Sequence, residues 1–199
     1  MDGGTVYIYA DESCLGNQFR GRARPGAAAG LLERFDSRRG WYRKDFACFE
    51  ADTTNNRMAL RSGALGLRSL RRASDVVFTS DSRYLVTGMK EWVHAWARKG
   101  WSRRGGPIEN LDLWRELVVA ARPHRIEWRW VKGHAGHPKN EYVNFLAVRT
   151  ARSGQAPAGL APSGFPEWLE AQRERGRYEE WLDVPPAEPF RPDPSPPAA

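Results

Sequence analysis

The stretch TVYIYAD at Thr5–Asp11 alternates apolar side chains with others and ends on a carboxylate. This period of two predicts a β-strand with one face in the core. The stretch DVVFTS at Asp75–Ser80 predicts a second, shorter strand, and Asp81 follows it directly. In a mixed sheet the ends of these two strands can lie side by side, and hard cations such as Mg²⁺ take oxygen ligands. The alternative for each aspartate is an ordinary turn or helix cap.

The other predicted elements fit around these two strands. Strand-like stretches cover residues 27–35, 41–49 and 125–131. Helical spacing covers residues 57–72, 110–121 and 139–151, and two further helical stretches lie within residues 82–99. The order is three strands, a helix, a strand, three helices, a strand and a helix. It predicts an α/β fold with a five-stranded mixed sheet, in which three antiparallel strands are followed by parallel additions flanked by helices.

The composition of the chain changes near residue 152. Residues 1–152 carry 27 Lys and Arg against 16 Asp and Glu, whereas residues 153–199 carry 4 against 8. We therefore expect a basic domain with a polyanionic partner such as nucleic acid, and an acidic tail. An arginine-rich composition is the alternative explanation of the basic charge. Ten of the 14 prolines lie in the tail, where we expect a helix within residues 165–182 and disorder over residues 185–199.

Several classes of protein are excluded by the sequence. No apolar run approaches the ~20 residues of a membrane span. The first residues lead straight into strand-like sequence without a signal peptide. Two cysteines, Cys14 and Cys48, provide neither a disulfide framework nor a zinc site. We therefore expect a cytoplasmic, monomeric protein.

Six motifs between residues 5 and 151 resemble those of bacterial ribonuclease HI, the type 1 branch of the ribonuclease H family. They are DxSCLGN at Asp11–Asn17, TTNNRM at Thr53–Met58, SDSxY at Ser80–Tyr84, WVHxWxxKGW at Trp92–Trp101, NxDLW at Asn110–Trp114 and WVKGHAGHPxNE at Trp130–Glu141. The resemblance implies a ribonuclease H-like fold. It also implies cleavage of the RNA strand of RNA–DNA hybrids with two Mg²⁺ ions.

The family's active site, as the resemblance implies it, has four carboxylates and a histidine. Asp11 and Asp81 match the first and third carboxylates, and His134 matches the histidine that assists water activation or product release. Ala59 and Asn144 stand where the helix glutamate and the last aspartate belong. Two unit charges about 4 Å apart interact by about 4 kcal/mol at an effective dielectric of 20. We therefore expect weak binding of Mg²⁺ or Mn²⁺, with Asn144 as a remaining oxygen ligand, and cleavage that is severely reduced or absent.

Three nearby acids are candidates to replace the missing carboxylates. Glu12 follows Asp11 directly, but successive side chains of a strand point to opposite faces. We therefore expect Glu12 to point away from the site unless the strand ends there. Glu50 and Asp52 precede the TTNNRM motif and are expected near the end of the third strand.

The residues that contact nucleic acid in the family are better preserved than the carboxylates. The resemblance assigns this role to Cys14, Asn17, Thr54, Asn55 and Asn56. Arg83 replaces the family's glutamine in the SDSxY motif, and its guanidinium fork is suited to a phosphate.

The segment Trp92–Arg104 resembles the family's basic protrusion. Its candidates for contact with nucleic acid are Trp92, Arg98, Lys99, Trp101, Arg103 and Arg104. The basic side chains would follow the phosphates. For the tryptophans we favour the alternative that they stack on one another and hold the protrusion together. Three other tryptophans are expected in the core, namely Trp114, Trp128 and Trp130.

Three hypotheses of function follow from these observations. The first is a ribonuclease H-like protein that binds RNA–DNA hybrid or double-stranded nucleic acid but has lost most or all of its catalysis. The second is a working endoribonuclease with a metal site rebuilt from Glu12, Glu50 or Asp52. The third is an adaptor in which residues 165–182 bind a protein partner.

Overall fold

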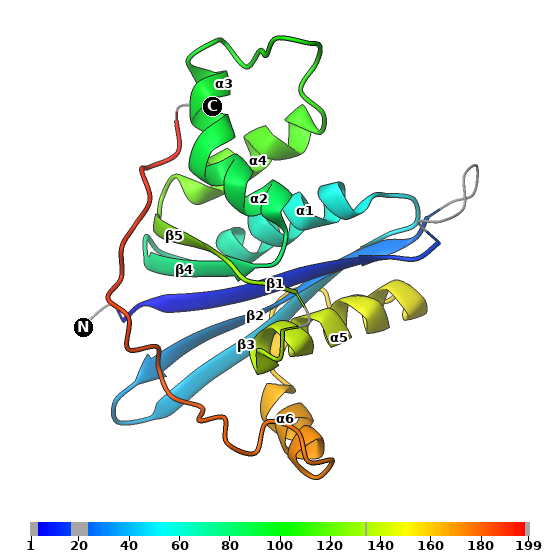
Figure 1. Cartoon of the computed structure of the whole chain (residues 1–199), viewed down its shortest axis with the longest axis vertical. Helices are drawn as coiled ribbons and strands as arrows, with labels where there is room; N and C mark the ends of the chain where they lie inside the picture. The colour runs from blue at the N-terminus through cyan, green and yellow to red at the C-terminus, as the bar shows by residue number, and fades with distance from the viewer. Residues whose placement is uncertain (1–3, 17–23, 134, 198–199) are drawn as a thin grey trace.

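The structure is a computed structural model that describes residues 4–16, 24–133 and 135–197. Its centre is a six-stranded sheet of order β5-β4-β1-β2-β3-β6 (Figure 1). The strands are β1 (Val6–Cys14), β2 (Gly26–Asp36), β3 (Gly40–Glu50), β4 (Asp75–Ser80), β5 (Arg125–Trp130) and β6 (Ala161–Pro162). The helices are α1 (Asn55–Arg68), α2 (Arg83–Thr87), the π-helix η1 (Gly88–Trp92), α3 (Val93–Ala97), α4 (Leu111–Ala121), α5 (Pro138–Ser153) and α6 (Phe165–Arg173).

The strand directions confirm the predicted mixed sheet. β1, β2 and β3 form an antiparallel meander, and β4 and β5 join in parallel on the other side of β1. The predicted count of five strands is one too few, because the tail adds β6 next to β3, with Lys44 opposite Pro162. A two-residue strand has no alternating pattern, so no signal of it exists in the sequence.

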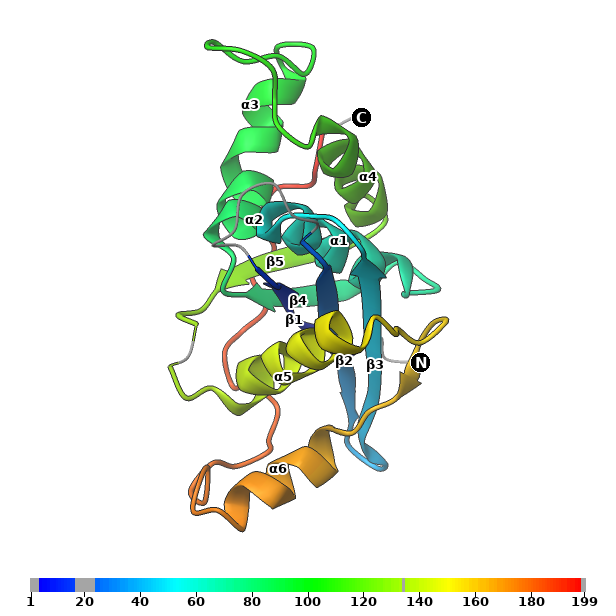
Figure 2. The same cartoon turned by 90° about the vertical axis from the view of Figure 1, so that its right-hand side faces the viewer.

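Helices cover both faces of the sheet (Figure 2). α1, α2 and α4 enclose one core cluster, to which β1 contributes Ile8 and Ala10. α5 and α6 enclose the other, to which β1 contributes Tyr9. Even-numbered residues of β1 therefore face α1, and odd-numbered ones face α5. None of the helices in the described ranges has the length and apolar character needed to cross a membrane.

The predicted helical region 82–99 forms three consecutive segments, α2, η1 and α3. The π-helical turn starts at Gly88, where a Cβ would overlap the ring of Trp114. Trp92, Trp96 and Trp114 pack with ring centroids 5.6 to 6.3 Å apart. Trp92 and Trp96 of the protrusion therefore do pack on each other and on Trp114, in tilted and edge-on arrangements typical of favourable aromatic pairs.

The tail folds back along the body (Figure 1). The backbone N–H of Asp193 donates to the carbonyl of Ile126, and its carboxylate accepts from the backbone N–H of Trp128 at 2.8 Å. The expectation of disorder over residues 185–199 is therefore wrong for the part that the structure describes. Composition alone misses these contacts because they depend on the unpaired edge of β5.

The tail helix α6 is shorter than the range 165–182 allows, since it ends at Arg173. Its buried residues Phe165 and Leu169 pack on the α5 side of the sheet, where the ring of Tyr142 lies 5.4 Å from that of Phe165. The helix is thus held by an apolar contact with the body.

Candidate active site and nucleic-acid interface

Asp11 and Asp81 lie at the same end of the two central strands. β1 and β4 pair in parallel up to Ala10 and Ser80, so the next residue of each strand emerges at one edge of the sheet. Ligand oxygens of Asp11, Glu12 and Asp81 all lie within 4.8 Å of one another. The structure thus brings together the two carboxylates paired on sequence grounds and adds a third.

The position of Glu12 differs from the expectation. By the alternation of β1, the odd-numbered Asp11 belongs to the sheet face covered by α5, and the even-numbered Glu12 belongs to the face covered by α1. Both side chains nevertheless reach Asp81, because the pairing of β4 with β1 ends at Ala10, opposite Ser80. The expectation that Glu12 points away from the site is therefore wrong. The alternation of the strand holds, but past the end of β4 both faces open onto the same space.

Ala59 lies on the face of the sheet from which Glu12 emerges. It is buried on α1 and belongs to the same core cluster as Ala10 of β1. Glu12 follows Ala10 by two residues and so lies on the same face of the strand. An alanine side chain at this place leaves more room than a glutamate would. The chain therefore lacks a carboxylate on the helix and has one on the adjacent strand.

The three carboxylates repel one another in a poorly solvated place. Burial, followed by the charge of Asp81, raises the pKa of Asp11 to about 7, and the Glu12 N–H that donates to Asp11 Oδ1 at 2.7 Å only partly opposes this. Burial, followed by the charges of Asp11 and Asp81, raises the pKa of Glu12 well above its usual value.

Two oxygens of this site are suited to a cation. Asp11 Oδ2 and Glu12 Oε2 are buried and have no hydrogen-bond partner among the described residues. A buried carboxylate without a partner is costly, and Mg²⁺ and Mn²⁺ prefer carboxylate oxygen. The residues present therefore fit a divalent cation.

The other two acids considered as replacements are engaged elsewhere. Glu50 Oε1 accepts from Arg61 Nε at 2.9 Å, and Asp52 Oδ1 accepts from the backbone N–H of Arg24 at 3.1 Å. Neither belongs to the group of three carboxylates. Of the three acids considered, only Glu12 therefore lies with Asp11 and Asp81 among the described residues.

Helix α5 lies beside the carboxylates. The charge of Glu141 contributes to the raised pKa of Asp11. Asn144 follows Glu141 by three residues, so it lies on the same face of α5, where it is half-buried. His134 and Asn17, expected to act in catalysis and in binding, lie outside the described residues.

Four of the expected nucleic-acid-binding residues lie where β1 ends and α1 begins. They are Cys14, Thr54, Asn55 and Asn56. A Cβ at Gly26 would lie 2.6 Å from the sulfur of Cys14 and 2.5 Å from Cγ2 of Thr53, so glycine permits this close approach. Thr54 caps α1. Burial raises the pKa of Cys14 to about 11, which agrees with a role other than nucleophile.

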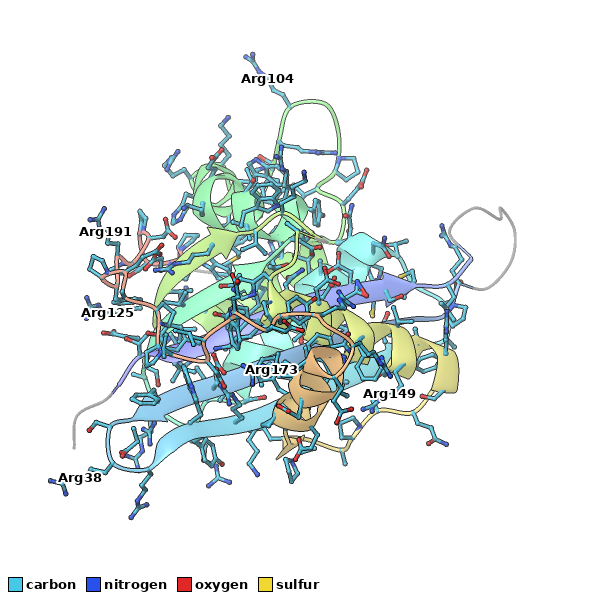
Figure 3. The ribbon with its side chains drawn as sticks, turned by 60° about the horizontal axis from the view of Figure 1, so that its bottom comes forward. Arg38, Arg104, Arg125, Arg149, Arg173 and Arg191 are labelled. Atoms are coloured by element: carbon cyan, nitrogen blue, oxygen red, sulfur yellow. The ribbon has the colours of Figure 1, made fainter. Side chains whose placement is uncertain are left out.

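The basic protrusion has its cations outside and its tryptophans inside. Exposed basic residues are Arg98, Lys99, Arg103 and Arg104. Arg104 lies on the loop between α3 and α4 and points away from the body (Figure 3). Trp92 and Trp101 are only partly exposed and pack against the core cluster. Their packing supports a structural role, so the basic edge is the part available to phosphate.

Trp130 was expected in the core, and this is wrong. Trp114 and Trp128 are buried, whereas Trp130 is 41% exposed. Trp130 is the last residue of β5 and lies at the same end of the sheet as the carboxylates. The guanidinium carbon of Arg83 lies 4.3 Å from the centroid of its ring. Nothing in the alternating pattern of β5 distinguishes this exposed indole from a buried one.

A mixed sheet of this order, with carboxylates at the common end of its two central strands and a basic helical protrusion, defines a ribonuclease H-like fold. The model of the RNase H family matches residues 3–152. The chain belongs to the RNase H family.

Known relatives support this assignment. Ribonuclease HI of Neisseria meningitidis is 44% identical over 149 residues, which are 74% of this chain and 95% of the relative. Ribonuclease H of Chromohalobacter salexigens is 42% identical over 160 residues, or 80% and 92% of the two chains. A solved structure, described as LC9-RNase H1, "a type 1 RNase H with the type 2 active-site motif", is 45% identical with a TM-score of 0.89. It covers 99% of this chain and 95% of its own.

Proposed function

We propose that this protein is a divalent-metal-dependent endoribonuclease that cleaves the RNA strand of RNA–DNA hybrids. The observation that supports the proposal is the group of three carboxylates, Asp11, Glu12 and Asp81, within 4.8 Å of one another. The hypothesis of a rebuilt metal site is thereby favoured over that of lost catalysis, and Glu12 takes the part of the missing carboxylate.

The proposal depends on the concentration of acidic groups at this site. Three neighbouring carboxylates, two of them with a buried unpartnered oxygen, carry a cost that a divalent cation removes. Bound Mg²⁺ or Mn²⁺ would supply an activated water and neutralise charge developing on the phosphate. Asp11, Glu12 and Asp81 would hold the ion, Asn144 would offer an amide oxygen from α5, and His134 would assist proton transfer as the resemblance implies.

The rest of the surface supports a duplex substrate. Thr54, Asn55 and Asn56 lie at the start of α1. The exposed cations of the protrusion lie on the segment from α3 to α4, which projects from the body (Figure 1). Backbone N–H groups at a helix start and arginine side chains both suit phosphates. Discrimination of a hybrid requires contacts to the RNA 2′-OH as well as the DNA backbone.

A type 1 RNase H with a different active-site motif has a precedent in the description of LC9-RNase H1. That description concerns the relative alone, but the relative matches this chain over almost its whole length. It supports the view that the absence of the helix carboxylate at Ala59 does not by itself abolish activity.

A second candidate function keeps hybrid binding without cleavage. It is favoured by the replacement of two acids at Ala59 and Asn144, which leaves three carboxylates in the group rather than four. In this case metal binding is weak and the chain competes with other hybrid-binding proteins.

Cleavage of a labelled RNA–DNA hybrid with Mg²⁺ and with Mn²⁺ separates the two candidates. We expect cleavage by the unaltered chain and a loss of at least about 100-fold, or about 2.7 kcal/mol, in Glu12→Gln, with hybrid affinity retained. The matched variant is Ala59→Glu with Asn144→Asp, which restores the family's acids. No cleavage by the unaltered chain at any metal concentration, combined with cleavage by the double variant, would refute the proposal in favour of the binding function.

The adaptor hypothesis has less support from the structure than the two candidate functions above. Its acids Asp183, Glu188 and Asp193 pair with cations of the body itself. None of those three cations belongs to the exposed basic edge of the protrusion. A protein partner for residues 165–182, a monomeric state and a cytoplasmic location stay predictions.

A further inference from the structure

The turn that carries Asp81 is held by residues that follow β5. The sheet ladder continues to the end of β4, where the backbone N–H of Val131 donates to the carbonyl of Ser80 at 3.1 Å. One residue further, the carbonyl of Asp81 accepts from Nε1–H of Trp130 at 2.9 Å. An indole thus takes the place of the next backbone donor, just where the strand ends.

The ring of Trp130 is fixed from its other side by Arg83. The guanidinium carbon lies 4.3 Å from the ring centroid, a favourable cation–π distance. Arg83 begins α2, two residues after Asp81. The same short turn therefore supplies both the carbonyl that the indole holds and the cation that covers the indole.

The carboxylate of Asp81 is limited by Gly133. A Cβ at position 133 would overlap Asp81 Oδ2, so the backbone of this loop lies directly against the carboxylate. The atom that would be displaced is the end of a side chain, so an alanine here moves the carboxylate more readily than it unfolds the protein. Trp130 thus contacts the backbone carbonyl of Asp81, and Gly133 lies against its side-chain carboxylate.

We propose that Trp130 and Gly133 are positioning residues for the metal site: Trp130 holds the carbonyl of Asp81, and Gly133 leaves its carboxylate the room to face Asp11 and Glu12. The inference rests on the proposed function in assigning a metal to these carboxylates. It explains why a large aromatic side chain is 41% exposed at this edge of the sheet. Arg83 contributes by restricting the orientation of the indole.

Calorimetric titration of the full chain with Mn²⁺ alone measures the metal affinity and tests the proposal. Trp130→Phe keeps a ring beneath Arg83 but removes the N–H, and we expect an about fivefold loss in Mn²⁺ affinity, the size of one lost hydrogen bond. Gly133→Ala is expected to lose at least as much. Arg83→Met is the matched variant that keeps the stem over the ring, and it should change Mn²⁺ affinity by less than about twofold while weakening hybrid binding.

Hydrogen exchange of the metal-free protein is the second measurement. The turn of Asp81 includes the Ser82 N–H, which donates to Ser80 Oγ at 3.1 Å. We expect the amides of this turn to exchange several-fold faster in Trp130→Phe, with global stability unchanged. Unchanged exchange in Trp130→Phe would overturn the inference even if no metal binds. Hybrid cleavage is scored separately, so Mn²⁺ binding without cleavage contradicts the proposed function but not the positioning role.

Discussion

Two clusters of carboxylates in this molecule differ in whether their acids are paired with bases. At the carboxylate end of the sheet, Asp11 and Glu12 have buried oxygens that find no hydrogen-bond partner in the described part of the chain. On the α5 side, Glu33 is fully buried, but it pairs with Lys139 and with Arg43, whose Nε lies 2.8 Å away. In the first cluster, burial and neighbouring charges raise the pKa of Asp11 and of Glu12, whereas in the second cluster the acids are paired with bases.

The second cluster also anchors the tail. Asp183 Oδ1 lies 2.6 Å from Nη2 of Arg43 and 3.7 Å from Nζ of Lys139. Two acids and two bases thus balance within one buried group that joins β2, β3, α5 and the tail. A balanced cluster serves the fold, whereas an unbalanced one is costly to the fold and is suited to a ligand of opposite charge.

The largest effect is expected on breaking the balanced cluster. Lys139→Met leaves buried acids in excess over bases and should lower the free energy of unfolding by about 3 kcal/mol. Urea denaturation measures this. The double variant Lys139→Met with Glu33→Met removes both charges and should recover most of the loss. An equal loss in the double variant would show that packing of the Lys139 stem, and not charge balance, is responsible.

A smaller loss is expected at the far end of the tail. Asp193→Ala leaves the backbone N–H of Trp128 without its partner, which should cost about 1–2 kcal/mol and speed hydrogen exchange of that amide. Glu188→Ala is the control, because that acid is 75% exposed and its ion pair with Arg129 contributes little. Slow exchange of the Trp128 amide in Asp193→Ala would contradict the docking of the tail.

The unbalanced cluster should respond in the opposite direction. Glu12→Gln removes a carboxylate whose Oε2 is buried without a partner among the described residues, so the metal-free protein should gain up to about 1 kcal/mol of stability. The same variant should lose the rise in melting temperature that Mn²⁺ gives the unaltered chain. Thermal denaturation with and without Mn²⁺ checks both. Destabilisation of the metal-free protein would mean that the cluster is balanced by contacts within the fold.

The smallest effect concerns the unbalanced cations of the protrusion. Arg104→Ala should weaken hybrid binding uniformly across sequences and reduce the slope of log K against log salt by about 1. Stability should not change, because the side chain is exposed and points away from the body (Figure 3). A salt slope equal to that of the unaltered chain would place the hybrid away from this loop.

The fold was largely predictable because its signals are local. Alternation in Thr5–Asp11 and helical spacing in residues 57–72 depend on which face of each element meets the core, and both are visible in the sequence. That Ala59 and Asn144 stand where the resemblance implies acids is also visible in the sequence. The proximity of Asp11 and Asp81 followed from the rule that parallel strands end at a common edge.

Three features were decided only by the tertiary structure. Glu12 joins the site because β4 stops at Ser80, and the length of a neighbouring strand is not encoded around Glu12 itself. Trp130 is exposed at the last position of β5, opposite Ser80, where the pairing of β4 with β5 ends. The tail is ordered in its described part because Asp193 finds the free edge of β5.

The sequence by itself determined the topology and the basic charge of residues 1–152, since these follow from periodicity and residue identity. Only the folded chain shows that Glu12, and neither Glu50 nor Asp52, lies with Asp11 and Asp81. The point at which β4 ends determines whether side chains from both faces of β1 can approach Asp81. That point depends on the pairing of the two strands and not on the sequence of either strand alone.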